Sequence, residues 1–430
     1  MNNKFIKSTI ILIIGGFFTK ILGMIIKIVM TRIVGTEGIG LYSLISPTFI
    51  LFIAISQLGL PTALNVLIAK GHNTKRLLST AIIISLLIDL AIFILLMFSS
   101  NFIATNLLNE KRTVYSLLAM GLVFPFISVS NMLRSYFFAK ERMLPHVITN
   151  ILEDTVKLIL IITLLPYFLL KGLEYAIFFI VITNIASELT SIVIFIFLLP
   201  KFKTTKSELI PNKKTIKDLF SIAIPTTGSR LIGSIGYFLE PIILTFVLIK
   251  IGYSNKFIIN EYGIINGYVL PLILLPSFFT GAISQALIPN ISKGYSNKNY
   301  TFIKKRIKQA ILASLVIGIP ATFVFMFYPE LPLKFIYNTN KGITYTKFLA
   351  PICLMHYIQS PISSSLQAMN KAKISLKGTF YGMIIRTILL FILSYLHIGI
   401  WGLIIATGIN IVFVTMFDYY HAKKIIQKHL

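Results

Sequence analysis

Lysine and arginine residues stand inside long apolar stretches of this 430-residue chain, where an ionised side chain has little water around it. The candidates are Lys20, Lys27, Arg230 and Arg386. Cations at such positions are costly and tend to face a cavity or a partner, and they form charge-assisted hydrogen bonds with phosphate oxygens. These residues predict a site that binds an anionic group away from bulk water. For Lys27 and Arg386 there are structural alternatives, in which the lysine snorkels outward and the arginine packs against a carboxylate.

Acidic residues stand in the same kind of apolar stretch and allow two interpretations. Lys157 follows Glu153 by four residues and Asp154 by three, a spacing that permits an ion pair on one helix. The first interpretation is a structural network in which this lysine neutralises one acid. The second is a sodium or proton site that couples the protein to an ion gradient, with Asp89 and Glu188 as its residues.

The composition shows which kind of element must hold these charges. Hydrophobic residues make up 56% of the chain and charged residues 13%, whereas soluble domains carry about 25% charged residues. A chain this apolar is neither a soluble enzyme nor a soluble nucleic-acid-binding protein. The single cysteine, Cys353, excludes an internal disulfide, and the six histidines lack the spacing of metal ligands. The sequence predicts an all-α, polytopic membrane protein without a metal site.

Apolar segments of membrane-spanning length recur along the whole chain. A helix needs about 20 residues to cross the hydrocarbon core of a bilayer. Twelve segments meet this requirement. They are residues 8–31, 41–69, 77–98, 114–138, 146–170, 175–199, 218–249, 264–288, 307–328, 344–369, 376–396 and 399–421.

The distribution of positive charge predicts the orientation of these spans. The net charge is +26, and far more lysine and arginine falls in the loops that are inside when both termini are cytoplasmic than in the opposite set. Such a bias marks cytoplasmic loops. The basic loop 201–217 has an alternative interpretation as a nucleic-acid-binding segment, but it lacks interleaved aromatic residues. We expect a multi-pass protein of the cell membrane that binds no nucleic acid.

Short motifs repeat in the same order in the two halves of the chain. The stretch TKILG at residues 19–23 matches SRLIG at 229–233, AKG at 69–71 matches SKG at 292–294, and FAK at 138–140 matches MNK at 369–371. Parallel repeats of this kind are typical of transporters whose substrate site lies between the lobes. The sequence predicts a six-helix lobe over residues 1–199, a basic cytoplasmic linker over 200–217, and a second six-helix lobe over 218–430.

Two of the candidate cations occupy matching positions of these repeats. Lys20 and Arg230 both fall in the first matched motif. At the rise of an α-helix, each lies about 18 Å from the cytoplasmic side, near the middle of the bilayer. We therefore expect both side chains to face a cavity between the lobes.

The longest motifs resemble a known family. These are RIVGTEGIGLY at residues 32–42, QLGLP at 57–61, PTTGSRLIGS at 225–234 and LEP at 239–241. They are similar to the polysaccharide-transporter branch of the multidrug/oligosaccharidyl-lipid/polysaccharide exporter superfamily, and within it to the sporulation proteins and the lipid II flippases. The resemblance implies a MATE-like fold. It departs at one point, because lipid II flippases usually have fourteen helices and twelve are expected here.

The resemblance implies a flippase for an undecaprenyl-pyrophosphate-linked oligosaccharide or a lipid II-like cell-wall precursor. Cell-wall synthesis enzymes are then expected as partners. The sequence contains no ATPase motif, so we expect no cofactor, and energy from a Na⁺ or H⁺ gradient, from the membrane potential or from the downstream removal of product. We expect a monomer, because the two internal lobes already form the site. Two alternatives stand beside it. The first is an exporter of drugs or cations in the same superfamily. The second is a membrane sugar polymerase or ligase, which is disfavoured because the acids of the outside loops stand alone, so we expect no enzyme.

Overall fold

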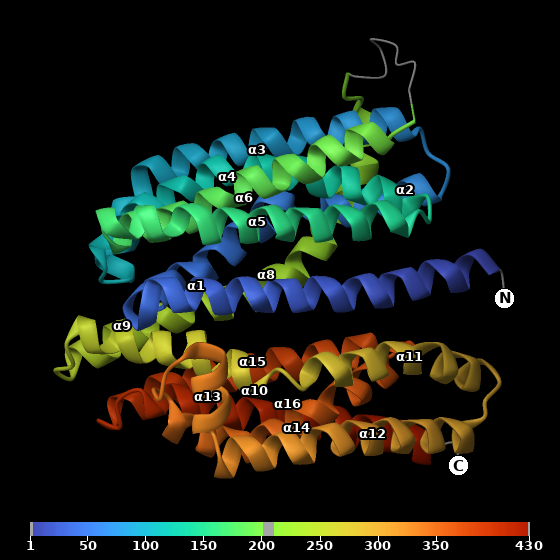
Figure 1. Cartoon of the computed structure of the whole chain (residues 1–430). Helices are drawn as coiled ribbons and strands as arrows, with labels where there is room; N and C mark the ends of the chain where they lie inside the picture. The colour runs from blue at the N-terminus through green and yellow to red at the C-terminus, as the bar shows by residue number, and fades with distance from the viewer. Residues whose placement is uncertain (1–2, 201–209, 429–430) are drawn as a thin grey trace. The chain divides into compact units, whose positions relative to one another are not determined.

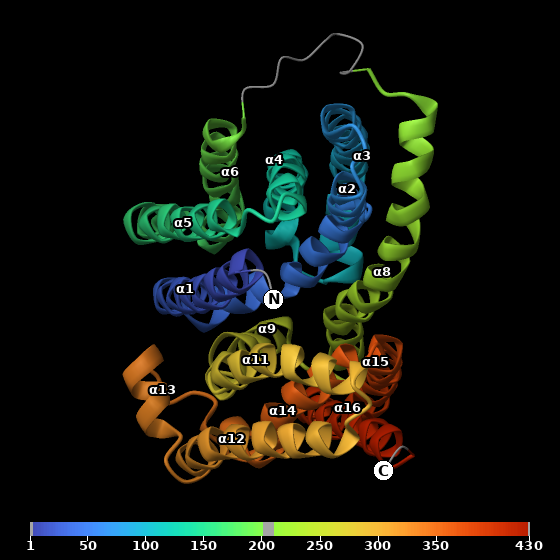
Figure 2. The same cartoon turned by 90° about the vertical axis from the view of Figure 1, so that its right-hand side faces the viewer.

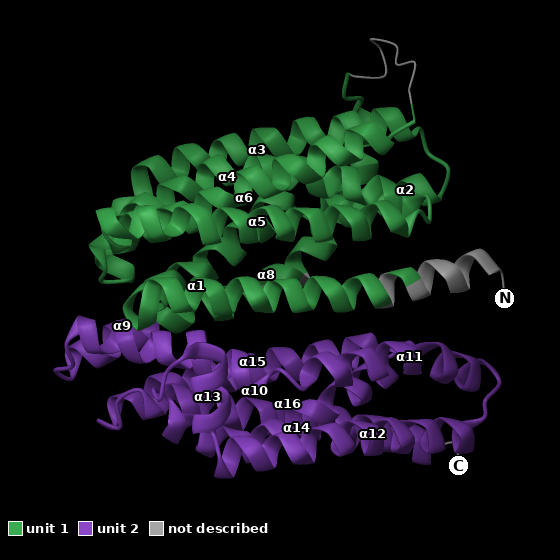
Figure 3. Cartoon of the chain, viewed as in Figure 1, with its two compact units in different colours: residues 1–242 green, residues 243–430 purple. Residues whose placement is uncertain are grey.

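The computed structural model describes residues 3–200 and 210–428, and over these ranges the chain is helical with no strand. Helices suit a chain this apolar, because in hydrocarbon every backbone donor and acceptor must be satisfied within its own segment. The chain forms two compact units, Met1–Ile242 (unit 1) and Ile243–Leu430 (unit 2), shown in Figure 3. Half of the basic linker expected over 200–217 lies outside the described residues, and α8 (Lys213–Lys250) begins within its last part. The boundary between the units lies inside this helix.

Unit 1 consists of long helices that run side by side (Figures 1 and 2). Contacts join α3 to α4, α4 to α6, α5 to α6 and α1 to α5. The helices are α1 (Asn3–Gln57), α2 (Leu60–Ala69), α3 (Thr74–Phe102), α4 (Val114–Ala139), α5 (Met143–Lys171), α6 (Leu173–Leu198) and the first part of α8 (Lys213–Lys250). The short turns η1 (Ile103–Leu107) and η2 (Lys111–Thr113) connect α3 to α4.

Glycines interrupt the first helical stretch twice. At Gly35, φ is 68° and ψ is −171°, so α1 is kinked into two helices there. Gly59 has a φ of 62° and separates α1 from α2. Glycine adopts positive φ readily because it has no Cβ, and Pro61 favours a helix start at this point since its missing N–H would be unbonded there anyway. The expected span 41–69 is therefore broken into α1 and α2.

Unit 2 contains the remainder of α8 and a second set of helices. They are α9 (Asn255–Gly263), η3 (Ile264–Val269), α10 (Leu270–Ile273), α11 (Ser277–Ser296), α12 (Tyr300–Phe327), α13 (Glu330–Tyr337), α14 (Ile343–Ala368), α15 (Ala372–Tyr395) and α16 (Trp401–Gln427). The stretch Asn255–Ile273 meets Ser277–Ser296 at a bend of 50°. The expected span 264–288 is thus broken beside Pro276, as its counterpart in unit 1 is broken before Pro61.

Each unit has its own apolar core, and helices in corresponding order build both. In unit 1 the core side chains come from α2, α3, α4, α6 and the start of α8, with Leu64, Phe137 and Phe195 fully buried. In unit 2 they come from α11, α12, α14 and α16, with Ile291 and Leu366 fully buried. Four helices of each core thus stand in corresponding order, and the core of unit 1 also contains the start of α8.

The helices have the length and the apolar surface that a membrane-spanning protein requires. Among the described residues, eight helices are long and apolar enough to span a bilayer, or nine if the bent pair is one span. The first of these, Ile14–Ala69, contains both the kink at Gly35 and the break at Gly59. Two further helices have sufficient length, α5 with 29 residues and α14 with 26, but α5 carries more charged residues and α14 is more polar. Each of the twelve expected spans lies largely in helices, although 41–69 and 264–288 are broken. Large apolar side chains such as Phe98 and Phe197 are 83% exposed, which suits lipid and not water.

Candidate functional site

The first half of α1 carries two of the expected cations. Lys20 is exposed and Lys27, two turns further along, is half-buried. Gly15 packs against α5 so closely that a Cβ atom there would lie 2.3 Å from Val147 Cγ1. At 100° per residue, Lys20 points about 140° away from this contact. The packing of α1 on α5 therefore turns Lys20 away from α5.

The other two cations come from different parts of the chain. Arg230 lies on α8 in unit 1 and is exposed. Arg386 lies on α15 in unit 2, is half-buried, and donates through Nε to Thr407 Oγ1 on α16 at 3.3 Å. The structure thus places Lys20, Lys27 and Arg230 in one unit and Arg386 in the other, and a substrate site formed by all four stays a prediction.

Helices α4, α5 and α6 bring polar side chains together around Glu153. Nη2 of Arg134 on α4 lies 3.1 Å from Glu153 Oε2, and Ser191 Oγ on α6 donates to the same oxygen at 2.8 Å. Each side chain of the ion pair is 20% exposed. A buried ion pair is stable when further hydrogen bonds satisfy it, as the serine does here. Glu153 therefore links three helices of unit 1.

Lys157 belongs to the same region but not to the ion pair that its spacing predicted. Its Nζ donates to Asn184 Oδ1 on α6 at 2.8 Å, while Glu153 pairs with Arg134. Glu153, Asp154 and Glu188 still act electrostatically on Lys157. A network between helices replaces a pair within one helix, because α4 and α6 bring donors and acceptors against α5.

The two expected ion-coupling acids lie in different clusters. Glu188 on α6 is 9% exposed and interacts electrostatically with Lys157 and Glu153, so it belongs to the network just described. Asp89 on α3 is fully buried and accepts a hydrogen bond from Ser56 on α1. Ser56 Oγ lies in turn 2.9 Å from Ser128 Oγ on α4. Asp89 is thus surrounded by hydroxyl groups rather than by other charges.

Unit 2 contains a buried acid that sequence reasoning missed. Asp418 on α16 is fully buried and accepts hydrogen bonds from Ser363 on α14 and from Ser375 on α15, the latter at 3.0 Å. Arg134 in unit 1 was missed as well. Both lie inside expected spans, 399–421 and 114–138, and an ionisable residue inside a span was the signal that could have identified them.

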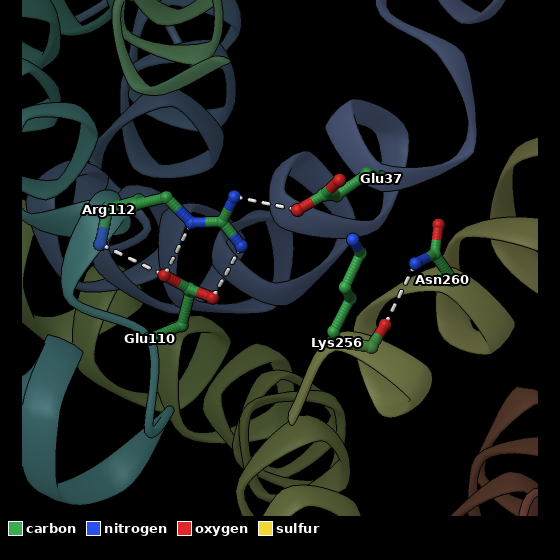
Figure 4. A network of polar contacts seen from close by, with 5 residues as sticks. All are labelled: Glu37, Glu110, Arg112, Lys256 and Asn260. Atoms are coloured by element: carbon green, nitrogen blue, oxygen red, sulfur yellow. Dashed lines mark hydrogen bonds and ion pairs between the residues drawn. The ribbon is translucent and has the colours of Figure 1, made fainter. Parts of the chain in front are cut away.

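An arginine fork lies beside the kink of α1 in unit 1 (Figure 4). Arg112 donates through Nε and Nη2 to the two carboxylate oxygens of Glu110, both at 2.9 Å. Its Nη1 donates to Glu37 Oε1 at 2.7 Å, two residues past Gly35. The planar guanidinium suits such bidentate binding. The fork ties the segment between α3 and α4 to the second half of α1.

No resident metal site emerges from the described ranges. Within residues 3–200 and 210–428, no three histidine, cysteine, aspartate or glutamate side chains lie close enough to hold a metal ion. Cys353 is a buried thiol on α14. The polar groups of this structure are hydroxyl, carboxylate, amide and cationic side chains, which bind anions or small cations.

Comparison with known proteins places these features in a family. The family model described as polysaccharide biosynthesis protein matches residues 5–295, and the MatE model matches residues 265–392. Stage V sporulation protein B of Bacillus subtilis (strain 168) is 34% identical over 98% of this chain and 84% of that protein. The lipid II flippase MurJ of the same organism is 21% identical over 90% of this chain and 77% of that protein.

A solved structure shows the same fold. A multidrug resistance MATE family transporter of the MOP superfamily, in an inward-facing conformation, superposes with a TM-score of 0.73 at 15% identity. The superposition covers 96% of this chain and 95% of that one. By name, MurJ is a flippase and the protein of this solved structure is a transporter. The chain belongs to the polysaccharide biosynthesis protein family and is a multi-span membrane protein with the fold of MATE transporters.

Proposed function

We propose that this protein is a flippase that moves an undecaprenyl-pyrophosphate-linked oligosaccharide, or a lipid II-like cell-wall precursor, across the cytoplasmic membrane by alternating access. The observation that carries the proposal is the similarity to a sporulation protein and to a lipid II flippase over 98% and 90% of the chain. The MATE fold supplies two lobes that can rock around a central site. The isoprenoid tail stays in lipid while the head group crosses.

The distribution of charge supports an anionic head group. Lys20 and Arg230 are both exposed. Arg134 forms an ion pair with Glu153, and Lys157 donates to Asn184. Cations at matching repeat positions suit a pyrophosphate that leaves water, because each supplies a charge-assisted hydrogen bond. Lys20 and Arg230 form the core of the proposed site, and Lys27 and Arg386 extend it.

Energy for the transport comes from the membrane rather than from a cofactor in this proposal. Moving one elementary charge through the membrane potential supplies about 2.3 kcal/mol per 100 mV, and a Na⁺ or H⁺ gradient adds to it. Both termini lie in the cytoplasm, as the excess of positive charge in alternate loops favours. A monomer suffices because one chain carries both repeats, and the partners are enzymes that make or consume the lipid-linked sugar.

Reconstitution into liposomes tests this function. A fluorescent undecaprenyl-pyrophosphate sugar is placed in the bilayer, and movement between leaflets is measured as protection from an external quencher. Wild type is compared with Lys20→Ala, Arg230→Ala and Lys250→Ala. The last variant is the matched control, since it removes an exposed cation from the end of α8, 20 positions after Arg230.

We expect flipping by wild type and by Lys250→Ala, and at least a tenfold lower rate in the two other variants, since each loses a charged hydrogen bond worth about 1.5–3 kcal/mol. No movement of the lipid by wild type would contradict the function. If Lys20→Ala and Arg230→Ala still flip the lipid at the wild-type rate, the proposed function stands and the proposed substrate site is contradicted.

A second candidate function is the export of drugs or organic cations, which the MatE match over residues 265–392 favours. A cavity for cations requires acidic or aromatic side chains at its surface. In unit 1, however, Glu153 is paired with Arg134 and Asp89 is fully buried. The same liposomes distinguish the two functions, because an exporter of cations accumulates a fluorescent organic cation and leaves the lipid-linked sugar in place.

A further inference from the structure

We propose that α13 lies in the plane of the membrane surface and that its exposed face, Leu331 and Phe335, inserts into the lipid there. The partner of this face is the acyl chains of phospholipids, just below their head groups. In the topology proposed above, this leaflet is the outer one, which would receive a flipped lipid. The inference concerns how unit 2 is held in the bilayer, so it goes beyond the proposed function and is tested without transport.

The position of α13 along the chain confines it to a membrane surface. Helix α12 is long and apolar enough to span the bilayer, and Lys308 is the last charged residue of its lysine-rich start. Phe327 follows Lys308 by 19 positions, which is about 29 Å along a helix, and the hydrocarbon core is about 30 Å thick. Only Tyr328 and Pro329 separate Phe327 from Glu330, where α13 begins. Helix α13 therefore starts within about 11 Å of the far boundary of the hydrocarbon core.

The length and direction of α13 keep it at that surface. Its 8 residues extend for about 12 Å, far less than is needed to cross the membrane. Figures 1 and 2 show that α13 runs across the direction of α12, at the edge of unit 2. Asn338 ends the helix in the left-handed conformation with a φ of 54°, and α14, an expected span, begins at Ile343. A short helix between two spans thus lies along the surface.

Helix α13 has two apolar faces, one buried in unit 2 and one largely exposed. Leu333 is fully buried, and Tyr337 is 4% exposed with its ring 5.3 Å from that of Tyr268 in η3. Leu331 and Phe335 lie one turn apart and are 63% and 86% exposed. At 100° per residue, Leu331 points about 160° away from Leu333. The helix is therefore held by one face and presents the other to its surroundings.

Lipid is the surrounding that suits this exposed face. Large apolar side chains are unfavourable in water, whereas an interfacial helix buries its apolar face about 5–10 Å into the boundary between head groups and acyl chains. The neighbouring end of α12 also exposes an apolar side chain, Phe327, by 53%. Lys334 is exposed and lies about 60° from Leu331 around the helix. Its stem can follow the apolar surface while its ammonium group reaches the lipid phosphates.

The size of the face argues against a second copy of the chain as its occupant. A stable protein interface buries about 1,000 Å² or more. An aromatic side chain buries at most about 250 Å², so Leu331 and Phe335 together fill only part of such an interface. Two large apolar side chains on a short helix are instead sufficient for an anchor in lipid.

Tryptophan fluorescence tests the insertion, because Trp401 is the single tryptophan of the chain. Full-length protein with Trp401→Phe and Phe335→Trp is placed in phosphatidylcholine liposomes whose acyl chains carry bromine either near the head groups or near their ends. Bromine quenches only a tryptophan that it approaches closely. Two matched proteins carry the new tryptophan elsewhere. Val316→Trp lies on α12, is 73% exposed, and is 11 positions before Phe327, and Asn340→Trp lies in the exposed loop after α13.

We expect the emission of Phe335→Trp to be blue-shifted relative to that of Asn340→Trp. Bromine near the head groups should quench it at least about twofold, and bromine near the chain ends should quench it less. Val316→Trp should show the reverse order, since it lies about 16 Å from the end of α12 and so near the middle of the bilayer. Asn340→Trp should respond least to either lipid.

A second measurement leaves Trp401 in place, where its ring packs against those of Tyr345 and Phe348. A spin label on Phe335→Cys is compared for collisions with oxygen, which dissolves in lipid, and with a nickel chelate, which stays in water. Cys353 is fully buried and is not labelled in the folded protein. Insertion predicts more collisions with oxygen at Phe335→Cys and more with the chelate at Asn340→Cys. This measurement decides if Trp401→Phe does not fold.

Two results would overturn the insertion. An emission from Phe335→Trp that matches Asn340→Trp and responds to neither lipid would place this face in water. A blue-shifted emission that bromine does not quench would place protein on the face, such as a second copy of the chain. The flipping assay is separate, so a protein that flips lipid without inserting α13 keeps its proposed function and loses only this inference.

Discussion

Local sequence rules identify poorly which partners the charged residues of the interior find. Lys157 and Glu153 satisfy the spacing for an ion pair on one helix, yet Glu153 pairs with Arg134, 19 positions away on another helix. Side chains on neighbouring helices can meet as closely as those on one helix, but which ones meet depends on a register set by packing, which no local pattern encodes. The sequence therefore predicted that charged residues would lie within the membrane spans. It did not predict which of them would contact one another.

Removal of Arg134 measures how much its pair contributes. Arg134→Ala leaves Glu153 with Ser191 as its remaining donor. Breaking a fully buried pair costs 3–5 kcal/mol, and an exposed pair contributes less than 1, so at 20% exposure we expect a loss of about 2 kcal/mol. Thermal unfolding in detergent checks this value.

The double variant provides the control for that measurement. Arg134→Ala combined with Glu153→Ala removes both charges and so leaves neither of them unpaired. We expect it to be more stable than the sum of the single losses implies. Strictly additive losses would mean that the two side chains do not interact in solution.

At the scale of elements, sequence located the helices and missed their breaks. Each of the twelve expected spans lies largely in helices, because an apolar run of membrane length has no other stable backbone in lipid. The interruptions at Gly59 and before Pro276 were not expected, although these residues were visible. Glycine and proline are tolerated in membrane helices, so their presence alone does not reveal where a helix ends.

The break at Gly59 is held in place by its neighbours, which a single substitution can test. A Cβ atom at Gly59 would lie 2.6 Å from the backbone oxygen of Ala223 and 2.3 Å from Thr226 Oγ1, both on α8. Gly59→Ala combines this overlap with a positive φ. We expect it to lower stability by roughly 3 kcal/mol, seen as a lower Tm.

Gly71 supplies the matched control for this break. Its φ is 87°, and no atom lies within 4 Å of the position that a Cβ would take. Gly71→Ala therefore carries only the conformational cost, about 1 kcal/mol. Equal losses in the two variants would show that α8 does not confine the break.

The whole molecule combines two separate cores with a strong excess of positive charge. The cores of units 1 and 2 use helices in corresponding order, which is the packing counterpart of the repeated motifs. The net charge of +26 plays no part in either core. The start of α12 is an example, because it carries three exposed lysines, Lys304, Lys305 and Lys308. No acidic residue occurs between Glu261 and Glu330 to balance their charge.

The excess of positive charge predicts that the thermal stability of the protein depends on the charge of the surrounding lipid. Each lysine or arginine near an anionic membrane surface contributes about 1 kcal/mol of attraction. We therefore expect a higher Tm in nanodiscs that contain phosphatidylglycerol than in nanodiscs of phosphatidylcholine alone. The difference should shrink in about 1 M salt, where the screening length falls to about 3 Å.

The lysines of α12 show whether the effect is local or general. A variant with Lys304→Gln, Lys305→Gln and Lys308→Gln keeps the length and polarity of these side chains and removes three charges. If they lie at the membrane surface, the gain in Tm from phosphatidylglycerol should fall, while the Tm in phosphatidylcholine stays the same, because their exposed side chains contribute little to the core. An unchanged gain would place the start of α12 away from the lipid head groups, and with it contradict the expected topology of this loop.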